Sequence, residues 1–409
     1  MIASEKANVV IIGGGIFGCA IAYYYTKNYP GKKIVLLERN ELCNSATSRA
    51  AALLTIIRTK QSYIPLSLET YRAIMDMEKQ LGESLDAKKV GMMHVAASES
   101  SRKNLEAVMK LAEECRQPAK YISNEVAHRM SPWLNAEEAI GIGLFSNEAY
   151  CDPYLLGTFF ARCAKMQGAD IRLGIEVTTL IMDGKTVCGV STSTGNILAE
   201  KVIIATGAWA PIFAAQAGIG LPMAPVRSQY WITGKAAIFP LNSPMVLLPD
   251  AQAYARPEGG SLLFGIREAN SFSASPKDIP PDISNFPFSP DAGMNDLSEV
   301  IDKLARFFPG IYDVGLKNYI AGFSGYTPDG NLSMGIAPGV NNLLLATGCA
   351  GAGISVSGGV GRAFAEMAAD RPNPYDFSDF DIMRFGIIDP FSKEWLSKCA
   401  NARSKKVSG

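Results

Sequence analysis

The hydrophobic pattern of the chain opens with one apolar run that two different structures could explain. The run NVVIIGGGIFGCAIAYYY, residues 8–25, is long enough for a membrane span, which needs about 20 mostly apolar residues. However, three consecutive glycines, Gly13 to Gly15, follow a β-branched stretch, and helix propensity is poor in such a segment. The pattern therefore predicts a buried strand over 9–12, a glycine turn, and a helix that ends at the NYPG stretch.

The glycines of this turn have the spacing of a dinucleotide-binding motif. Gly13, Gly15 and Gly18 follow G-x-G-x-x-G, in which the first makes a tight turn, the second admits a pyrophosphate and the third packs helix on strand. A second predicted strand, KIVLLE, ends in Glu38, where a carboxylate accepts hydrogen bonds from a ribose hydroxyl pair. This order predicts a dinucleotide-binding unit. The alternative is that the glycines form ordinary turns and that Glu38 is an ordinary charged residue at the end of a strand; the sequence leaves this alternative open.

The remaining pattern predicts further helices and strands around this unit. Helices are expected at 67–85, 104–116, 152–168, 296–308 and 360–370. Strands are expected at 90–98, 225–233, 253–268 and 341–347, and residues 189–210 are expected to form a hairpin and then a buried strand. The Pro/Ser-rich stretch 271–291 is expected to be a loop, either a lid or surface decoration. The last residues, NARSKKVSG (401–409), are expected to form a frayed, solvated tail.

Length, charge and cysteine usage narrow the class of protein. A chain of 409 residues is expected to form two domains, because single cores stop growing beyond about 250–300 residues. Its 39 basic and 39 acidic residues give no excess charge for nucleic acid or an anionic membrane. The eight cysteines are scattered without a C-x-x-C pair, which argues against zinc and a secreted disulfide framework. With no signal peptide ahead of the first strand, the cytoplasm is expected.

Three segments together resemble a known family. LLLATGCAGAGISVSGGVGRAFAEM (343–367) places a second glycine-rich turn between a strand and a helix, and VIIATGAWA (202–210) supplies another strand with a small-residue turn. With the N-terminal unit and GYTPDGN (325–331), these segments resemble, in the same order, the FAD-dependent D-amino-acid oxidase superfamily, which includes glycine oxidase and the dimethylglycine and sarcosine dehydrogenases. The resemblance runs from about Ala7 to Phe385.

This resemblance implies an α/β fold with two domains. A Rossmann-like FAD-binding domain of the GR2 type would be discontinuous, over residues 1–60, 148–222 and 322–385. A substrate domain of an antiparallel sheet plus helices would comprise 61–147 and 223–321, and residues 386–409 would be a C-terminal extension.

The resemblance also implies which residues contact FAD. The first glycine motif and Glu38 would hold the ADP half, the loop 47–49 would lie against pyrophosphate and ring, and the backbone of Val177 would face adenine. The turn 348–353 would lie at the pyrimidine edge, where a helix N-terminus stabilises the negative charge of reduced flavin. The full implied set is Gly13, Gly15, Ile16, Phe17, Gly18, Glu38, Arg39, Thr47, Ser48, Arg49, Val177, Thr206, Gly207, Gly348, Gly351, Ala352, Gly353 and Ile354.

Four departures from the family pattern bear on how FAD is attached, which substrate is bound and which electron acceptor is used. The histidine and the cysteine that bond covalently to FAD in some members correspond here to Arg49 and Gly322, so FAD is expected to be non-covalent. The substrate-binding arginine of glycine oxidase and D-amino-acid oxidase corresponds to Ser324, which disfavours a simple D-amino acid. The lysine that aids oxygen reactivity in monomeric sarcosine oxidase corresponds to Leu263, which favours a dehydrogenase over an oxidase. The acceptor is either O2 or an electron-transfer partner.

The substrate is expected to contact Arg58, Tyr254, Arg256 and Tyr326. An arginine binds a carboxylate with two-pronged geometry, and Arg58 resembles the carboxylate-binding arginine of monomeric sarcosine oxidase; a surface arginine or a salt bridge is the alternative. Tyr254 and Arg256 are two apart on a predicted strand, so they share a face and are expected to reach the cavity; for Tyr254 a core position is the alternative. Tyr326 would wall the pocket.

The scarcity of histidine separates the candidate reactions. Oxidation of a 2-hydroxy acid usually needs a base, commonly histidine, and only His94 and His128 are present. An amine binds as the neutral amine and needs no such base, so the sequence predicts an FAD-dependent oxidoreductase of a secondary or N-methyl amino acid, with an imine product. The alternatives are a 2-hydroxy-acid dehydrogenase with His94 as base and a flavin-binding regulatory subunit. No metal is expected, and an oligomer is compatible with the sequence.

Overall fold

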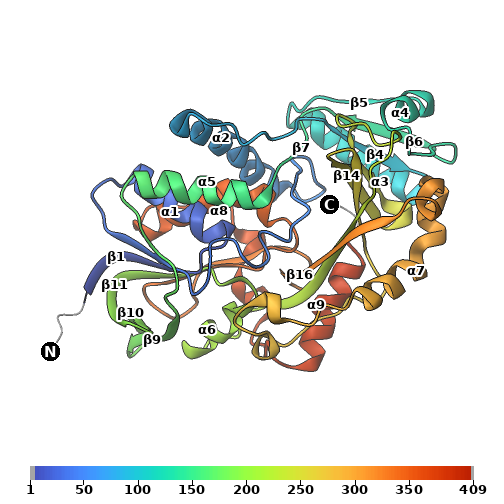
Figure 1. The fold of residues 1–409 in the computed structure, drawn as a ribbon. Coiled ribbons are helices and arrows are strands. Elements are labelled where there is room, and N and C mark those ends of the chain that lie inside the picture. Colours follow the sequence, from blue (N-terminus) through green and yellow to red (C-terminus); the bar gives the residue numbers. More distant parts are fainter. Residues whose placement is uncertain (1–4, 407–409) are drawn as a thin grey trace.

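The apolar run at the N-terminus folds as strand β1 (Glu5–Ile12) and helix α1 (Ile16–Asn28) in the computed structural model, which describes residues 5–406 (Figure 1). Side chains of β1 are buried on both faces: Val9 and Ile11 pack on one side and Val10 and Ile12 on the other. The predicted strand, turn and helix are therefore confirmed. Within residues 5–406, no helix combines the length and apolar character needed to cross a bilayer.

β1 lies at the centre of the first eight-stranded sheet. The order is β17-β18-β11-β1-β2-β8, with the β9–β10 hairpin attached to β11. β1 runs parallel to both its neighbours, and β11–β18 and β2–β8 are also parallel. The other strands of this sheet are β2 (Ile34–Leu37), β8 (Asp170–Arg172), β9 (Val177–Asp183), β10 (Thr186–Thr192), β11 (Gly195–Ile204), β17 (Ser333–Ile336) and β18 (Leu343–Thr347).

Helices cover one face of this sheet and a hairpin covers the other (Figure 1). On one face α1 packs against α5 (Pro153–Met166) and α8 (Gly353–Ala368), and α8 packs against α2 (Ile64–Leu81). On the opposite face lie the β9–β10 hairpin and the short helix α6 (Ala210–Gln216). The sheet is thus buried on both faces, which explains its nearly continuous apolar strands.

Glycines allow α8 to approach its two neighbours at backbone distance. A Cβ on Gly359 would lie 2.3 Å from Leu66 Cα of α2, and one on Gly361 would lie 2.8 Å from the Ala20 backbone of α1. Neither helix leaves room for a side chain at these positions. The glycine-rich sequence SGGVG is therefore a packing surface between three helices.

The second sheet is also eight-stranded and is mostly antiparallel, in the order β16-β12-β15-β14-β13-β4-β6-β5. Its strands are β4 (Met92–Ala96), β5 (Ala119–Tyr121), β6 (Gly141–Phe145), β12 (Ala224–Thr233), β13 (Met245–Leu248), β14 (Ala253–Glu258), β15 (Ser261–Ile266) and β16 (Leu316–Tyr326). A short two-stranded pairing joins β3 (Leu53–Leu54) and β7 (Ala149–Tyr150).

The outer face of the second sheet carries its own core. There, α7 (Pro290–Phe307) and α4 (Asn124–Met130) pack over Trp231 and Phe264, whose rings stack with centroids 5.7 Å apart. The inner face faces the first sheet and presents Tyr230, Tyr254 and Leu263. Helix α3 (Glu99–Glu114) packs beside β4 and β6.

The fold class is confirmed: a parallel, Rossmann-like α/β unit is joined to an antiparallel sheet with helices. The strand expected at 90–98 contains β4, and the helix expected at 296–308 corresponds to the C-terminal part of α7, which ends at Phe307. Strand β16 continues to Tyr326 in the second sheet, four residues beyond the domain boundary expected at 322.

Short 3-10 helices lie at Gln61–Tyr63, Gly207–Trp209, Pro249–Ala251, Pro276–Asp278, Ile283–Asn285, Pro309–Tyr312, Ser378–Phe380 and Ile382–Phe385.

The expected frayed tail is wrong for the residues that the structure describes. Residues 401–404 belong to helix α9 (Lys393–Ser404), which packs against β12 and β16. Arg403 of this helix is fully buried and pairs with Glu268. The segment 401–406 is polar and basic, which is typical of a solvated tail. The partner of Arg403, Glu268, lies far away in the chain, so the local sequence gives no sign of the buried pair. Residues 407–409 lie outside the described part.

Gly359→Ala is expected to lower the free energy of unfolding by about 1–3 kcal/mol, because the new methyl group would overlap the backbone of α2. Urea denaturation followed by circular dichroism measures the change. Gly315→Ala, at an exposed position with no atom within 4 Å of the added Cβ, is the matched control and is expected to change stability by less than about 0.5 kcal/mol. Equal midpoints for the two variants would contradict this account of the α2–α8 contact.

Candidate active site

A cavity lies between the first sheet and the inner face of the second. Its walls come from the ends of β1, β2, β11 and β18, from the segment 39–58, and from β12, β14 and β16. Ligands in open α/β sheets bind at the carboxyl ends of the strands, and this cavity has that position. Sixteen of the eighteen residues that the family resemblance assigns to FAD lie in the wall: Gly13, Gly15, Ile16, Phe17, Glu38, Arg39, Thr47, Arg49, Val177, Thr206, Gly207, Gly348, Gly351, Ala352, Gly353 and Ile354.

The two remaining residues of that set have other positions. Gly18 packs within the β1–α1 turn, where a Cβ would lie 2.0 Å from the Gly13 carbonyl oxygen. Ser48 does not line the cavity, and its hydroxyl donates to the Ser45 carbonyl at 3.3 Å. Gly18 therefore serves the close packing of helix on strand, and Ser48 stabilises the loop that it belongs to.

The glycines at the start of α1 leave space for a ligand. Gly13 has a φ of +105°, and a Cβ there would lie 2.6 Å from the Ala205 carbonyl oxygen, so only glycine fits this turn. A Cβ on Gly15 would meet only Thr47 Oγ1, at 3.6 Å. The helix N-terminus is thus open toward the cavity at Gly15, where its partial positive charge can attract a phosphate.

Glu38 is held at the end of β2 by backbone donors. Its carboxylate accepts from the Gly14 N–H at 2.8 Å and from the Asn40 N–H at 2.9 Å. The side chain lines the cavity beside the opening of α1, so it can also accept from the hydroxyls of a ribose. Next to it, Arg39 stacks on Trp209 at 4.2 Å, and Val177 lines the same end of the cavity. This aromatic and apolar end can hold an adenine.

The segment after β2 is closed by two polar contacts. Thr47 Oγ1 accepts from the Ile16 N–H of α1 at 3.0 Å, and Arg49 donates to the Asn44 carbonyl at 2.6 Å. Arg49 also packs against Gly322, where a Cβ would lie 2.9 Å from Arg49 Cδ. The positions that correspond to covalent attachment points in some relatives therefore lie against each other here, as an arginine and a glycine.

A second helix N-terminus opens on the cavity. Ala352 precedes α8 with no side-chain cap, and the first turn of α8 has no acidic residue. Thr206 Oγ1 lies in the cavity wall, buried, without a hydrogen-bond partner among residues 5–406. The N-cap residues of α1 and α8 supply no side-chain cap, and the Thr206 hydroxyl is unpaired among residues 5–406. These groups fit a ligand with a pyrophosphate and a polar ring, so the donors present fit FAD.

Arg58 lies at the opposite end of the cavity from Glu38 and is 5 % exposed. Its Nη2 donates to Ser355 Oγ of α8 at 2.8 Å, and its Nε donates to the Thr55 carbonyl at 3.4 Å. Burial lowers the pKa of the guanidinium, which Glu148 partly offsets by its charge. The side chain is therefore fixed in the wall, where it can bind a carboxylate.

The inner face of the second sheet supplies two tyrosines. Tyr254 lies across Gly265 of the neighbouring strand, where a Cβ would be 2.4 Å from the tyrosine Cζ, so the ring fills the space of the missing side chain. Burial raises the pKa of Tyr254, which keeps its hydroxyl protonated. Tyr326, 2 % exposed, lines the same end of the cavity with its hydroxyl beside Gly351.

The prediction that Arg256 reaches the cavity is not supported by its contacts. It shares the inner face with Tyr254, as expected, but its Nε donates to the Ala51 carbonyl at 2.7 Å and its Nη1 pairs with Glu258. Its guanidinium lies 4.6 Å from the Tyr150 ring centroid. Arg256 does not line the cavity but supports the segment that does, because strand spacing sets the face and not the distance from the site.

Two cationic residues in the cavity wall were missed by sequence reasoning. Arg267 follows β15 and lies 5.1 Å from the Tyr254 ring centroid. Lys406 follows α9, and its Nζ donates to the Ala350 carbonyl at 2.9 Å. No local motif marks either residue. The only hint in the sequence was that Arg267 lies two positions beyond Gly265 on the face that carries Tyr254.

His94 lies outside this cavity. It contributes to a smaller neighbouring pocket, and its ring centroid lies 4.6 Å from that of Phe145, with the two rings tilted by 43°. Burial, together with the charge of Arg58, lowers its pKa to about 4, so the ring is neutral at neutral pH. His128 is also structural, because its Nδ1 contacts the Leu134 carbonyl at 3.0 Å. Among residues 5–406, no group of His, Cys, Asp or Glu side chains is arranged to hold a metal ion.

Comparisons with known proteins agree on one family for this chain. Residues 8–367 match the family described as FAD dependent oxidoreductase. Human mitochondrial sarcosine dehydrogenase is 27% identical over 393 residues, which cover 93% of this chain and 42% of the relative. The 4-methylaminobutanoate oxidase (formaldehyde-forming) of Paenarthrobacter nicotinovorans is 25% identical over 383 residues, which cover 92% of this chain and 45% of the relative. The chain therefore spans less than half the length of these relatives.

A solved structure shows the same fold. L-proline dehydrogenase from P. horikoshii superposes with a TM-score of 0.82 at 24% identity, covering 93% of this chain and 98% of that one. Nearly the whole of both chains therefore shares one architecture.

Glu38→Ala is expected to weaken FAD binding at least about tenfold, because it removes the carboxylate that lies beside the opening of α1. Fluorescence titration of FAD into the flavin-free protein measures the dissociation constant. Glu41→Ala is the control: this exposed residue also lines the cavity but makes no side-chain hydrogen bond within residues 5–406, so its affinity is expected to stay within about twofold. Wild-type affinity in the Glu38 variant would contradict the assignment.

Glu148→Gln is expected to flatten the pH dependence of stability. Burial raises the pKa of Glu148 to about 7, against 4.5 for the free side chain, so the folded protein holds this proton more tightly. The resulting stabilisation is present below about pH 4.5 and is lost as the pH rises through about 7, by up to about 3 kcal/mol. Urea denaturation at pH 5, 6, 7 and 8 tests it, with exposed Glu137→Gln as control. Parallel curves for wild type and Glu148→Gln would contradict it.

Proposed function

We propose that this chain, a member of the FAD-dependent oxidoreductase family, oxidises the C–N bond of a secondary or N-methyl amino acid to an imine, which water then hydrolyses. The family assignment makes it an FAD-dependent amino-acid or amine oxidoreductase. Sarcosine, dimethylglycine and glycine are the model substrates, because the sarcosine dehydrogenase and 4-methylaminobutanoate oxidase named above act on N-methyl amino acids.

The observation that carries this proposal is the position of Arg58. A buried arginine, fixed in the cavity wall by contacts that include Ser355 and the Thr55 carbonyl, places a guanidinium at the substrate end of the cavity. A carboxylate is the natural partner for such a planar fork. With the carboxylate on Arg58, the amine of a small amino acid lies within the same end of the cavity.

When bound, FAD accepts the hydride of the C–N oxidation. The chain contributes placement and exclusion of water. Tyr254 and Tyr326 wall the substrate end with aromatic rings, and Tyr254 keeps a protonated hydroxyl that can donate to the substrate carboxylate. Orienting the reacting bond in this way is a main source of rate enhancement in such reactions.

The contacts of His94 favour an amine over a 2-hydroxy acid. A hydroxy acid needs a base to accept its hydroxyl proton. His94 lies in the neighbouring pocket and not in the wall of the main cavity, so it is poorly placed for that task. A neutral amine donates its lone pair to the forming C=N bond and needs no such base.

We also propose that FAD is bound without a covalent bond and that the enzyme acts as a dehydrogenase. By the family resemblance, Arg49 and Gly322 stand at the positions of covalent attachment, and neither residue offers the histidine nitrogen or the cysteine sulfur that would form such a bond. Leu263, at the position of the oxygen-activating lysine of monomeric sarcosine oxidase, is packed in an apolar cluster and 1 % exposed. Acid precipitation tests the first point, because non-covalent FAD is released into the supernatant.

The proposed reaction is tested by the visible spectrum of the purified protein. Sarcosine, dimethylglycine and proline, added without oxygen, are expected to bleach the flavin absorbance, and racemic 2-hydroxyglutarate is expected to leave it unchanged. Bleaching by the hydroxy acid alone would overturn the assignment of an amine substrate. Failure of every compound to bleach the flavin would remove the support for an amino-acid substrate.

Arg58→Lys is expected to raise KM for the amino acid at least about tenfold, with a smaller change in kcat, because an ammonium group cannot make the two-pronged contact. Steady-state assays with an artificial electron acceptor measure both constants. Arg72→Lys, at an exposed position of α2, is the control and is expected to leave both unchanged. An unaltered KM in the Arg58 variant would show that the substrate carboxylate binds elsewhere.

A further inference from the structure

Charge is distributed unevenly along the cavity. The carboxylates among its described lining residues are Glu38, Glu41 and Glu176, and Glu38 and Glu176 both lie close enough to Arg39 to act on its charge. These acids therefore lie at the end that fits adenosine. The lining residues Arg58, Arg267 and Lys406 belong to the other end, together with Tyr254. The substrate end is lined by cations without a lining carboxylate.

These three cations lie close enough to repel one another. Both Arg267 and Arg58 lower the pKa of the Lys406 amine, in addition to the larger effect of burial, and Arg267 lowers the pKa of Arg58. Such an arrangement is unfavourable unless a negative charge compensates it. Glu148, outside the wall, acts on the charge of Arg58, and one monocarboxylate would add only a single negative charge to a wall that also holds Arg267 and Lys406.

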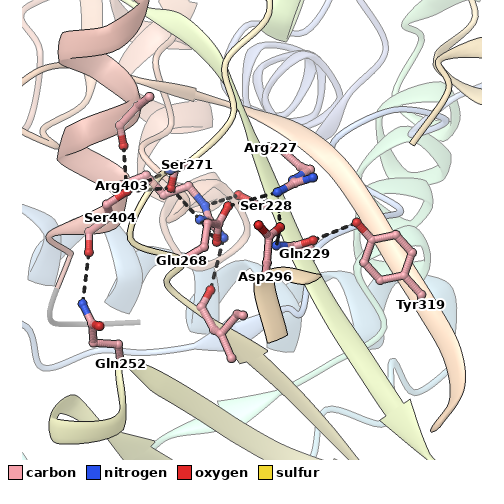
Figure 2. A network of polar contacts seen from close by, with 12 residues as sticks. Arg227, Ser228, Gln229, Gln252, Glu268, Ser271, Asp296, Tyr319, Arg403 and Ser404 are labelled. Atoms are coloured by element: carbon pink, nitrogen blue, oxygen red, sulfur yellow. Dashed lines mark hydrogen bonds and ion pairs between the residues drawn. The ribbon is translucent and has the colours of Figure 1, made fainter. Parts of the chain in front are cut away.

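The nearby carboxylate of Glu268 is already paired. It lies between two arginines, in direct contact with Arg403 and with its Oε1 3.8 Å from Arg227, and it is fully buried (Figure 2). Arg227 also pairs with Asp296. Within residues 5–406 the ion pairs of Glu268 are with Arg403 and Arg227, and not with Arg267, the residue next to it.

The same ion pair fixes the positions of Arg267 and Lys406. Arg403 of α9 reaches Glu268, the Ile266 carbonyl at 3.2 Å and Ser271 Oγ at 2.9 Å, which ties the last turn of the helix to the end of β15 (Figure 2). Arg267 is adjacent to Glu268, and Lys406 is three residues beyond Arg403. One buried contact thus brings two cations from distant parts of the chain into one wall.

From this geometry we infer that Arg267 and Lys406 form a second carboxylate subsite, and that the substrate is an amino dicarboxylic acid with a secondary or N-methyl nitrogen. The inference rests on the proposed function for the oxidised bond, but the subsite itself depends only on the cavity. One carboxylate binds Arg58, and the other binds Arg267 and Lys406. The ring of Tyr254, with its centroid 5.1 Å from the Arg267 guanidinium, packs against this second subsite.

Binding of unreactive acids tests the subsite without catalysis. Glutarate and butyrate differ by one carboxylate, and calorimetric titration of the FAD-loaded protein is expected to show glutarate bound at least about tenfold more tightly. Lys406→Met is expected to remove most of that difference and Lys406→Arg to preserve it. Lys405→Met, at the exposed neighbouring position, is the control and is expected to behave as wild type. Equal binding of the two acids by wild type would overturn the subsite.

Reduction of the flavin by matched amines separates the subsite from the proposed reaction. Racemic N-methylaspartate and N-methylalanine differ by the second carboxylate, and the first is expected to reduce the flavin with a KM at least about tenfold lower. The Lys406→Met variant is expected to raise KM for N-methylaspartate and leave that for N-methylalanine unchanged. Equal KM values for both amines in wild type would overturn the subsite and leave C–N oxidation supported. Selective glutarate binding without flavin reduction by either amine would support the subsite and overturn the proposed reaction.

Discussion

The close approach of three helices on one face of the first sheet is the constraint on which the site depends. α8 meets α1 and α2 through glycines, so that backbone contacts backbone and the three axes have little freedom to shift. Because α1 and α8 both start at the cavity, this packing fixes the distance between two helix N-termini. The same packing holds Ser355 of α8 against Arg58. The cofactor end and the substrate end of the cavity are therefore set by one interface.

The second sheet adds the wall that selects the substrate. Its outer face is a self-contained core under α7, while its inner face places tyrosines and cations opposite α8. When one face of a sheet packs against its own core, side chains on the other face can be substituted without loss of the fold. This division makes the architecture, which L-proline dehydrogenase from P. horikoshii shares at a TM-score of 0.82, independent of the side chains that face the cavity.

Local sequence patterns were sufficient for much of the fold and for the part of the cavity that fits FAD. The glycine spacing, the β-branched strands and Glu38 act over short stretches, and backbone geometry dictates what such stretches form. The cavity wall includes Arg58, Tyr254 and Tyr326, which the sequence had placed there by resemblance to a family. The alternation of side chains correctly put Tyr254 and Arg256 on one face, but it could not show that Arg256 turns to the Ala51 carbonyl.

The sequence by itself determined the strand–turn–helix units, the order of the cofactor motifs and the family. Only the tertiary structure decided that the C-terminal segment is part of the site, because Arg403 pairs with Glu268 across 135 positions of chain. A charged side chain in a polar segment can be buried when an opposite charge in the core pairs with it, as Glu268 does with Arg403. The spacing of residues in the sequence does not identify such a distant partner. The positions of Lys406 and Arg267, and with them the charge of the substrate end, follow from this long-range contact.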